Sequence, residues 1–194
     1  MKSESAGRKS EAREKLLVAA GTLFFQRGFH AVGVDTIVEQ SGVTKMTMYK
    51  HFPSKDHLIV AILERSDELY WAWFESTIQD IGKPEEQLLA LVQAVENKRA
   101  QSPESVFCLY QAVAVEFPFP DHMAHQKAVR HKQSIVDRLA SLCRQANMSD
   151  PEQLALQLFV LLEGMCISSR MLGRSTPSAH MTAAAQALLQ SHRT

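Results

Sequence analysis

The stretch GVTKMTMYKHFPSKDHL, residues 42–58, predicts a short basic helix between two residues that interrupt helices. Gly42 precedes it at a position where a left-handed turn costs glycine little. Pro53 follows it and ends it, because proline has no backbone N–H to continue the hydrogen-bond pattern. We therefore expect a helix over residues 44–52 and the start of another helix at Lys55.

The two sides of this short helix differ in chemistry. At ~100° per residue, Met48, His51 and Phe52 fall on one side. The other side carries Lys45, Met46, Tyr49 and Lys50. A helix that only supports a core has no need of this outward set. In a DNA groove, by contrast, lysine and hydroxyl groups bind phosphates or base edges, and methionine packs on thymine methyl groups.

A second short helix precedes this one, and the pair has the spacing of a helix-turn-helix. Residues 34–41 predict a helix that buries Ile37 and Val38, and Gly42 supplies the turn. In this motif the second helix reads the DNA. A longer helix over residues 10–27 has apolar residues at helical spacing and completes a three-helix head. From these residues alone, DNA binding and an ordinary solvated basic surface remain equally open.

The charge distribution agrees with contact of a polyanion at one end of the chain. The 194 residues include 21 Lys and Arg and 21 Asp and Glu. Residues 1–58 have nine basic and six acidic side chains, a net charge of +3, and residues 59–194 have a net charge of −3. A positive head on a negative body suits nucleic-acid contact at the head. An asymmetry of this size also arises by chance.

The remaining sequence predicts further helices and no convincing strands. The expected helices cover about residues 10–27, 34–41, 44–52, 55–80, 85–101, 104–116, 121–147, 151–172 and 177–191. This pattern predicts an all-α fold of about nine helices. We expect a flexible arm over residues 1–9, a helix-turn-helix domain over residues 10–54 and a helical body over residues 55–194.

The head resembles the DNA-binding domain of TetR-type (tetracycline-repressor-like) regulators. The segments LLVAAGTLFFQRGF, VDTIVEQS and GVTKMTMYKHFPSKDHL carry the resemblance, which covers about residues 12–60. The matching pairs are Gly28-Phe29, Gly42-Val43, Met48-Tyr49, His51-Phe52 and Ser54-Lys55. The resemblance implies a sequence-specific DNA-binding transcriptional regulator and no enzyme. It further implies a ligand-responsive repressor that binds a near-palindromic operator as a dimer.

The resemblance also implies a set of DNA contacts. Thr44, Tyr49 and Lys55 resemble the phosphate contacts of the family. The base-proximal positions correspond to Lys45, Met46, Thr47 and Lys50. His51 takes a position that varies in the family between packing and backbone contact.

Two features near the head leave alternatives open. The helix over residues 34–41 starts with Gly33-Val34-Asp35-Thr36, where the family often has Ser or Thr as cap and phosphate contact. Thr36 is the expected substitute, or that contact is missing. The basic residues of the arm can reach a neighbouring minor groove or form a solvated tail; they are Arg8, Lys9 and Arg13.

The last two predicted helices indicate a homodimer. The helix over residues 151–172, PEQLALQLFVLLEGMCISSRML, is apolar around most of its circumference and has to be buried on several sides. The helix over residues 177–191 carries alanines that allow close helix approach. We expect both helices to form a four-helix bundle with a second copy. The alternative is a monomer in which residues 151–172 lie inside.

Family resemblance implies a pocket for a small-molecule effector among the helices over residues 55–147. Its candidate lining residues are Tyr70, Trp73, Phe74, Phe107, Tyr110, Gln111, Phe117 and His125. For each aromatic residue, plain core packing is the competing interpretation.

No cofactor is expected. Glu116, His122, His125 and His131 form the one tempting metal cluster, but ordinary surface histidines are the favoured interpretation. The three cysteines lack CxxC spacing, and a reducing cytoplasm is the simplest location. Two other classes remain open: a helical metal- or ligand-binding protein or enzyme that does not act on DNA, and a module whose basic head binds an acidic protein.

Overall fold

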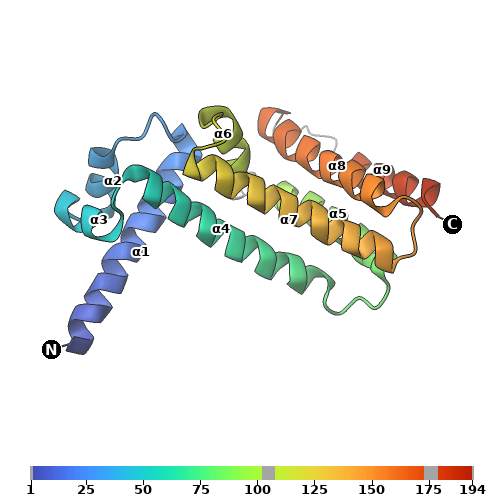
Figure 1. Cartoon of the computed structure of the whole chain (residues 1–194), viewed down its shortest axis with the longest axis horizontal. Coiled ribbons are helices and arrows are strands. Elements are labelled where there is room, and N and C mark those ends of the chain that lie inside the picture. The colour runs from blue at the N-terminus through green and yellow to red at the C-terminus, as the bar shows by residue number, and fades with distance from the viewer. Residues whose placement is uncertain (1, 102–107, 173–178, 194) are drawn as a thin grey trace. The chain divides into compact units, whose positions relative to one another are not determined.

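The computed structural model describes residues 2–101, 108–172 and 179–193. Within these ranges the chain forms helices, and the only strand-like pairing is an isolated bridge between Met148 and Arg193 (Figure 1). The helices are α1 (Lys2–Arg27), α2 (Val34–Ser41), α3 (Lys45–His51), α4 (Lys55–Ile78), α5 (Pro84–Gln101), α6 (Cys108–Glu116), α7 (Met123–Gln145), α8 (Pro151–Leu172) and α9 (Ala179–Ser191). The all-α prediction is confirmed for the described residues.

The largest difference from the predicted elements lies at the amino terminus. Helix α1 begins at Lys2, where the sequence predicted an arm over residues 1–9 and a helix from Ser10. These residues are polar but contain no proline, and the helix continues through them. Helix α6 begins at Cys108; the predicted start at residue 104 lies outside the described residues.

The chain divides into two compact units. Unit 1 comprises residues 1–67 and 109–128, and unit 2 comprises residues 68–108 and 129–194. Unit 1 is larger than the head predicted over residues 10–54, because the first half of α4, most of α6 and the start of α7 belong to it. Helices α4 and α7 each contribute residues to both units.

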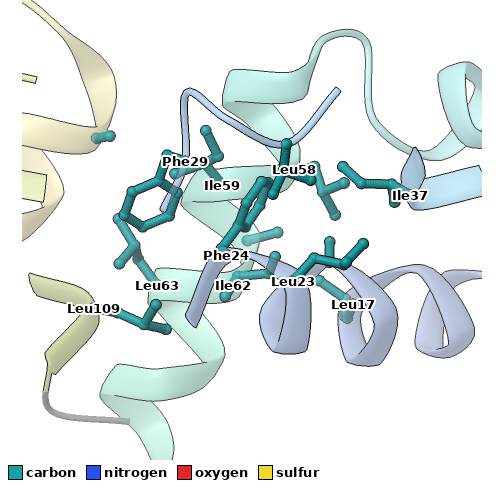
Figure 2. Packing of buried hydrophobic residues seen from close by; sticks show 14 of the residues in the cluster. Leu17, Leu23, Phe24, Phe29, Ile37, Leu58, Ile59, Ile62, Leu63 and Leu109 are labelled. Atoms are coloured by element: carbon teal, nitrogen blue, oxygen red, sulfur yellow. The ribbon is translucent and has the colours of Figure 1, made fainter. Parts of the chain in front are cut away.

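The core of unit 1 joins the head to α4 and α6. Figure 2 shows Phe24 of α1 and Ile37 of α2 among the leucine and isoleucine side chains of α4. The rings of Phe24 and Phe29 lie 5.0 Å apart, and Met48 of α3 belongs to the same buried cluster. Helices α1, α2 and α3 are therefore held by one continuous apolar core, which fixes how α3 is presented.

Unit 2 has a separate core, to which α5, α7, α8 and α9 contribute. The end of α9 is tied to the loop before α8, since the His192 ring pairs through Nδ1 with the Ser149 carbonyl at 2.7 Å and through Nε2 with Gln157 at 3.1 Å. The Glu96 carboxylate of α5 accepts hydrogen bonds from the backbone N–H and the hydroxyl of Thr182. These polar contacts fix the ends of α9 within unit 2.

Two methionines of α3 provide a matched test of this packing. Met48 is 0% exposed and Met46 is 67% exposed. We expect Met48→Ala to lower the free energy of unfolding by about 2 to 5 kcal/mol, because it leaves a cavity. Met46→Ala is expected to change it by less than about 0.5 kcal/mol. Urea unfolding followed by circular dichroism measures both, and equal effects would contradict the orientation of α3.

Candidate nucleic-acid interface

The ends of α3 are set by short-range contacts, of which the sequence predicted the Gly42 turn and the Pro53 stop. Gly42 has φ of 65°, the left-handed region, while a Cβ at this position would meet nothing within 4 Å. Backbone conformation and not space is therefore the reason for glycine here. Thr44 is the N-cap, and its hydroxyl accepts a hydrogen bond from the Thr47 N–H at 3.2 Å. At the other end Phe52 leaves the helical conformation with φ of −134°, ahead of Pro53.

The two sides of α3 lie as the helical wheel predicts. Met48 and Phe52 are buried in the core of unit 1, and His51 is half-buried beside the Phe52 ring. Tyr49 is 45% exposed, and Lys45, Met46 and Lys50 are exposed as well. Among the other predicted contacts, Thr44 is exposed, and Thr36 and Thr47 are half-buried. We call the exposed set Lys45, Met46, Tyr49 and Lys50 the reader face.

The start of α2 departs from the family pattern in the way the sequence indicated. Gly33 is the N-cap and provides no side-chain hydrogen bond. Asp35, in the first turn, accepts a hydrogen bond from the Lys45 ammonium at 2.7 Å. The hydrogen bond and the charge of Asp35 raise the pKa of Lys45. Sequence reasoning missed this pair, although both residues stand at the starts of short neighbouring helices.

The corner between α1 and α2 is held by a carboxylate from α6. Glu116 accepts hydrogen bonds from the backbone N–H of Phe29 at 3.0 Å and of His30 at 2.6 Å. Its own carbonyl lies 2.7 Å from Nε2 of His30. Gly28 precedes this corner with φ of 81°, and a Cβ there would lie 2.8 Å from the carboxylate. The backbone angle therefore favours glycine, and a Cβ at this position would also displace the Glu116 carboxylate. We call these contacts the Glu116 clamp.

Lys55 joins the same corner from the start of α4. Its ammonium donates a hydrogen bond to the Phe29 carbonyl at 2.6 Å and lies 5.9 Å from the centre of the Phe24 ring. Burial lowers the pKa of Lys55. One of its three donors is thus used inside unit 1. Its expected contact with phosphate stays a prediction.

The basic residues of α1 are placed only in part. Arg13 lies over the Phe52 ring, with 5.3 Å between the guanidinium carbon and the ring centre. It therefore packs beside the C-terminal end of α3. Arg8 and Lys9 lie in the first turns of α1, and their side chains fall outside the described part of the chain.

The predicted effector residues are divided between the two units. Tyr70, Trp73 and Phe74 lie in unit 2, whereas Tyr110, Gln111, Phe117 and His125 lie in unit 1. Tyr110 is buried, its hydroxyl donates to the Leu63 carbonyl at 2.6 Å, and burial raises its pKa. Phe117 packs on Phe29, and a ring nitrogen of His125 lies 2.8 Å from the Phe117 carbonyl. Phe107 lies outside the described residues.

Unit 2 contains a small apolar cavity of about 30 Å³. Tyr70, Phe159 and Cys166 line it, together with the buried His131. Lys132 and Glu163 also line the cavity and pair with each other at 2.6 Å. At this volume the cavity holds one or two water molecules. Of the predicted effector residues that the structure describes, Tyr70 is the one that lines it.

The proposed metal cluster is not assembled within the described residues. No group of three His, Cys, Asp or Glu side chains in that part of the chain is placed to hold a metal ion. Glu116 is used by the clamp, and His122 stacks on Phe117 at 4.4 Å. His131 belongs to unit 2, where its ring meets Tyr70 edge-on at 5.0 Å.

A short helix held by a buried core, with basic and hydroxyl groups outward and a capped turn before it, defines a helix-turn-helix DNA-binding protein. Residues 16–62 match the family model for bacterial regulatory proteins of the tetR family. Residues 84–185 match the model for the tetracyclin repressor-like C-terminal domain. The chain therefore belongs to the TetR family of DNA-binding transcriptional regulators.

Similar proteins agree with this assignment. The transcriptional activator FasR of Mycolicibacterium smegmatis is 35% identical over 86 residues, 44% of this chain and 39% of that protein. The transcriptional repressor KstR2 of the same species is 28% identical over 107 residues, 52% of this chain and 51% of that protein. The chain thus matches about half the length, or less, of these relatives.

Among solved structures, a TetR-family transcriptional regulator from Streptomyces coelicolor matches with a TM-score of 0.87 and 26% identity. The match covers 94% of this chain and 96% of that one, so it extends over both units. In the ranges that the structure describes, no helix is long and apolar enough to span a membrane.

The Glu116 clamp generates a prediction about stability. Glu116→Ala leaves the N–H groups of Phe29 and His30 without their carboxylate acceptor, and we expect the free energy of unfolding to fall by about 1 to 3 kcal/mol. Glu86→Ala is the matched control, because Glu86 is exposed and forms a surface pair with Lys83, and surface pairs contribute little. Chemical unfolding compares the two variants, and an equal loss of stability would argue against the clamp.

Proposed function

We propose that this regulator is a homodimeric repressor that binds a near-palindromic operator in the cytoplasm and is released by a small-molecule effector. The reader face carries this proposal. It combines two ammonium groups, a phenol and a thioether on a helix whose opposite side is buried. These groups suit phosphates, guanine edges and thymine methyl groups. A bound dimer would repress by occupying its operator.

The DNA contacts of the proposal follow from exposure. Lys45, Met46 and Lys50 would lie near the bases, with Thr47 partly accessible beside them. Phosphates would be bound by the hydroxyls of Thr36, Thr44 and Tyr49 and by Lys55. His51 is half-buried and would support the helix from its inner side. The N–H groups at the start of α3 that Thr44 leaves open add a favourable place for phosphate.

An exposed apolar stripe on α8 supports the dimer. Leu156, Val160, Ile167 and Met171 are exposed although they are large and apolar. Their spacing of four, seven and four residues places them on one side of the helix. On α9 the exposed residues include Ala183, Ala184 and Ala187, which permit close approach of another helix. A second copy that pairs α8 and α9 with their equivalents would cover the stripe, and a two-fold axis would present two reader faces to a palindromic site.

The effector would enter unit 2 near Tyr70, where the small apolar cavity lies. At about 30 Å³ the cavity has to expand before it accepts an effector, so binding would favour a different shape of the unit. Helix α4 runs from Lys55 in unit 1 to Trp73 and beyond in unit 2, and it is the proposed route of coupling. The effector would release DNA by binding the DNA-incompetent shape more tightly.

Selection of bound fragments from random duplex DNA tests the regulator function. Wild-type protein is expected to enrich a near-palindromic sequence and to bind it less tightly as salt rises, because phosphate contacts release counterions. A thermal-shift screen of small molecules on the same preparation then tests the effector. Enrichment of no sequence would overturn the proposal.

Tyr49→Phe tests the reader face, since it removes a single hydroxyl from an exposed ring. We expect several-fold weaker operator binding at matched salt, because each protomer loses one hydrogen bond to DNA. Lys45→Ala is expected to weaken operator binding as well. Lys83→Ala is its matched control, because Lys83 is also exposed and paired with a carboxylate but lies in unit 2. All three variants should keep the wild-type melting temperature, and unchanged affinity of the first two would contradict the assigned face.

Val160→Glu tests the dimer interface. Val160 is 66% exposed in the single chain, and a two-fold interface would bring two new carboxylates into an apolar contact. We expect monomers at micromolar concentration in analytical ultracentrifugation. Val115→Glu is the matched control, because Val115 is 79% exposed and lies on α6 in unit 1. A dimer that survives Val160→Glu would place the interface elsewhere.

A further inference from the structure

The ion pair between Asp35 and Lys45 lies on the surface where DNA is proposed to bind. The Lys45 ammonium is 2.7 Å from the Asp35 carboxylate, and both side chains are exposed. Exposed pairs of this kind add little to stability. The core under α3 already fixes the helix through Met48 and Phe52. Asp35 also lies in the first turn of α2, where a carboxylate modestly stabilises the helix start. That role does not require the pair with Lys45.

A carboxylate at this place opposes binding to a polyanion. Asp35 repels phosphates, and it neutralises the charge that Lys45 would otherwise offer to the DNA backbone. Non-specific affinity depends on such lysine–phosphate contacts. A surface that only needed to bind DNA tightly would have higher affinity without Asp35. The pair therefore points to a role in discriminating between DNA sequences.

The geometry around Lys45 favours a base contact. A free lysine is a flexible point charge with three donors, and it finds phosphates readily. Here one donor is committed to Asp35. The ammonium is thus held beside the start of α2. Two donors remain, and the pair as a whole carries no net charge to draw it to a phosphate.

We propose that Asp35 is a positioning residue for sequence recognition: it holds Lys45 so that the ammonium donates to O6 and N7 of a guanine in the major groove. Guanine presents these two acceptors side by side, and lysine is one of the side chains that bind them. This inference rests on the proposed function, because it names how the same interface discriminates between sequences.

The experiment uses the full-length protein and compares four variants with the wild type: Asp35→Ala, Glu39→Ala, Lys45→Ala and the double variant Asp35→Ala with Lys45→Ala. Glu39 is the matched control, since it is an exposed acidic residue one turn further along α2. Binding to the selected operator fragment and to a random duplex of equal length is measured over a series of salt concentrations. Selection from random DNA is repeated with the wild type and Asp35→Ala.

Asp35→Ala is expected to bind random duplex more tightly and the operator relatively less well, so that the specificity ratio falls on the order of tenfold. Its salt dependence should become steeper by about 0.9 per protomer, because the released Lys45 neutralises one more phosphate. The preference for guanine at one position of each half-site should weaken. Glu39→Ala should keep both the ratio and the guanine preference.

Three results would overturn the inference while leaving the DNA-binding function intact. Asp35→Ala could keep the wild-type ratio and salt dependence. Glu39→Ala could change them equally, which would reveal a general charge effect. Asp35→Ala could act as strongly in the Lys45→Ala background, which would show that Asp35 does not work through Lys45. A wild-type protein that enriches no sequence would instead overturn the proposed function and this inference together.

Discussion

The burial of Met48 and Phe52 decides which side of α3 meets solvent. Both side chains enter the core of unit 1, to which α1, α2, α4 and α6 also contribute. Residues on a helix keep fixed angular positions, so burying these two places Lys45, Tyr49 and Lys50 outside. Every DNA contact proposed for the reader face depends on this division. Helix α3 has only seven residues and would not be stable alone, so it depends on this core.

The Glu116 clamp adds a polar constraint to this apolar one. Consecutive backbone N–H groups at the start of an irregular segment need acceptors, and the corner between α1 and α2 provides none of its own. One carboxylate from α6 satisfies two of them, while Lys55 satisfies the Phe29 carbonyl. The head is therefore completed by residues from α4 and α6. This explains why the compact unit extends to residues 109–128.

Local chemistry made the head predictable from the sequence. Gly42 and Pro53 act on their immediate neighbours, and the spacing of Met48 and Phe52 indicates which side of the helix is buried. The family motif then supplied the function. The clamp could not be predicted, because Glu116 lies 87 residues from Phe29 and no local pattern links them. A carboxylate near histidines instead suggested a metal site, which the geometry of the described residues does not assemble.

The effector residues were harder to predict for the same reason. Aromatic residues at helical spacing mark burial, but spacing does not show which of two cores receives them. Tyr110 enters the core of unit 1 and Tyr70 that of unit 2. Which core receives each aromatic side chain depends on the long-range packing of α4 and α6. The helical wheel of a single helix does not predict that packing.

Two contacts of α4 within unit 1 would oppose a displacement of this helix caused by effector binding in unit 2. Tyr110 donates to the Leu63 carbonyl, and Lys127 pairs with Asp67 at 2.8 Å. Both contacts lie within unit 1, and the residues of α4 that follow Asp67 belong to unit 2. Under the proposed mechanism, an effector that displaces α4 must break these contacts or carry α6 and α7 along. If α6 moved with α4, Glu116 and the corner between α1 and α2 would move as well. Even a small shift of α4 would then be transmitted to the reader face through packed and hydrogen-bonded groups.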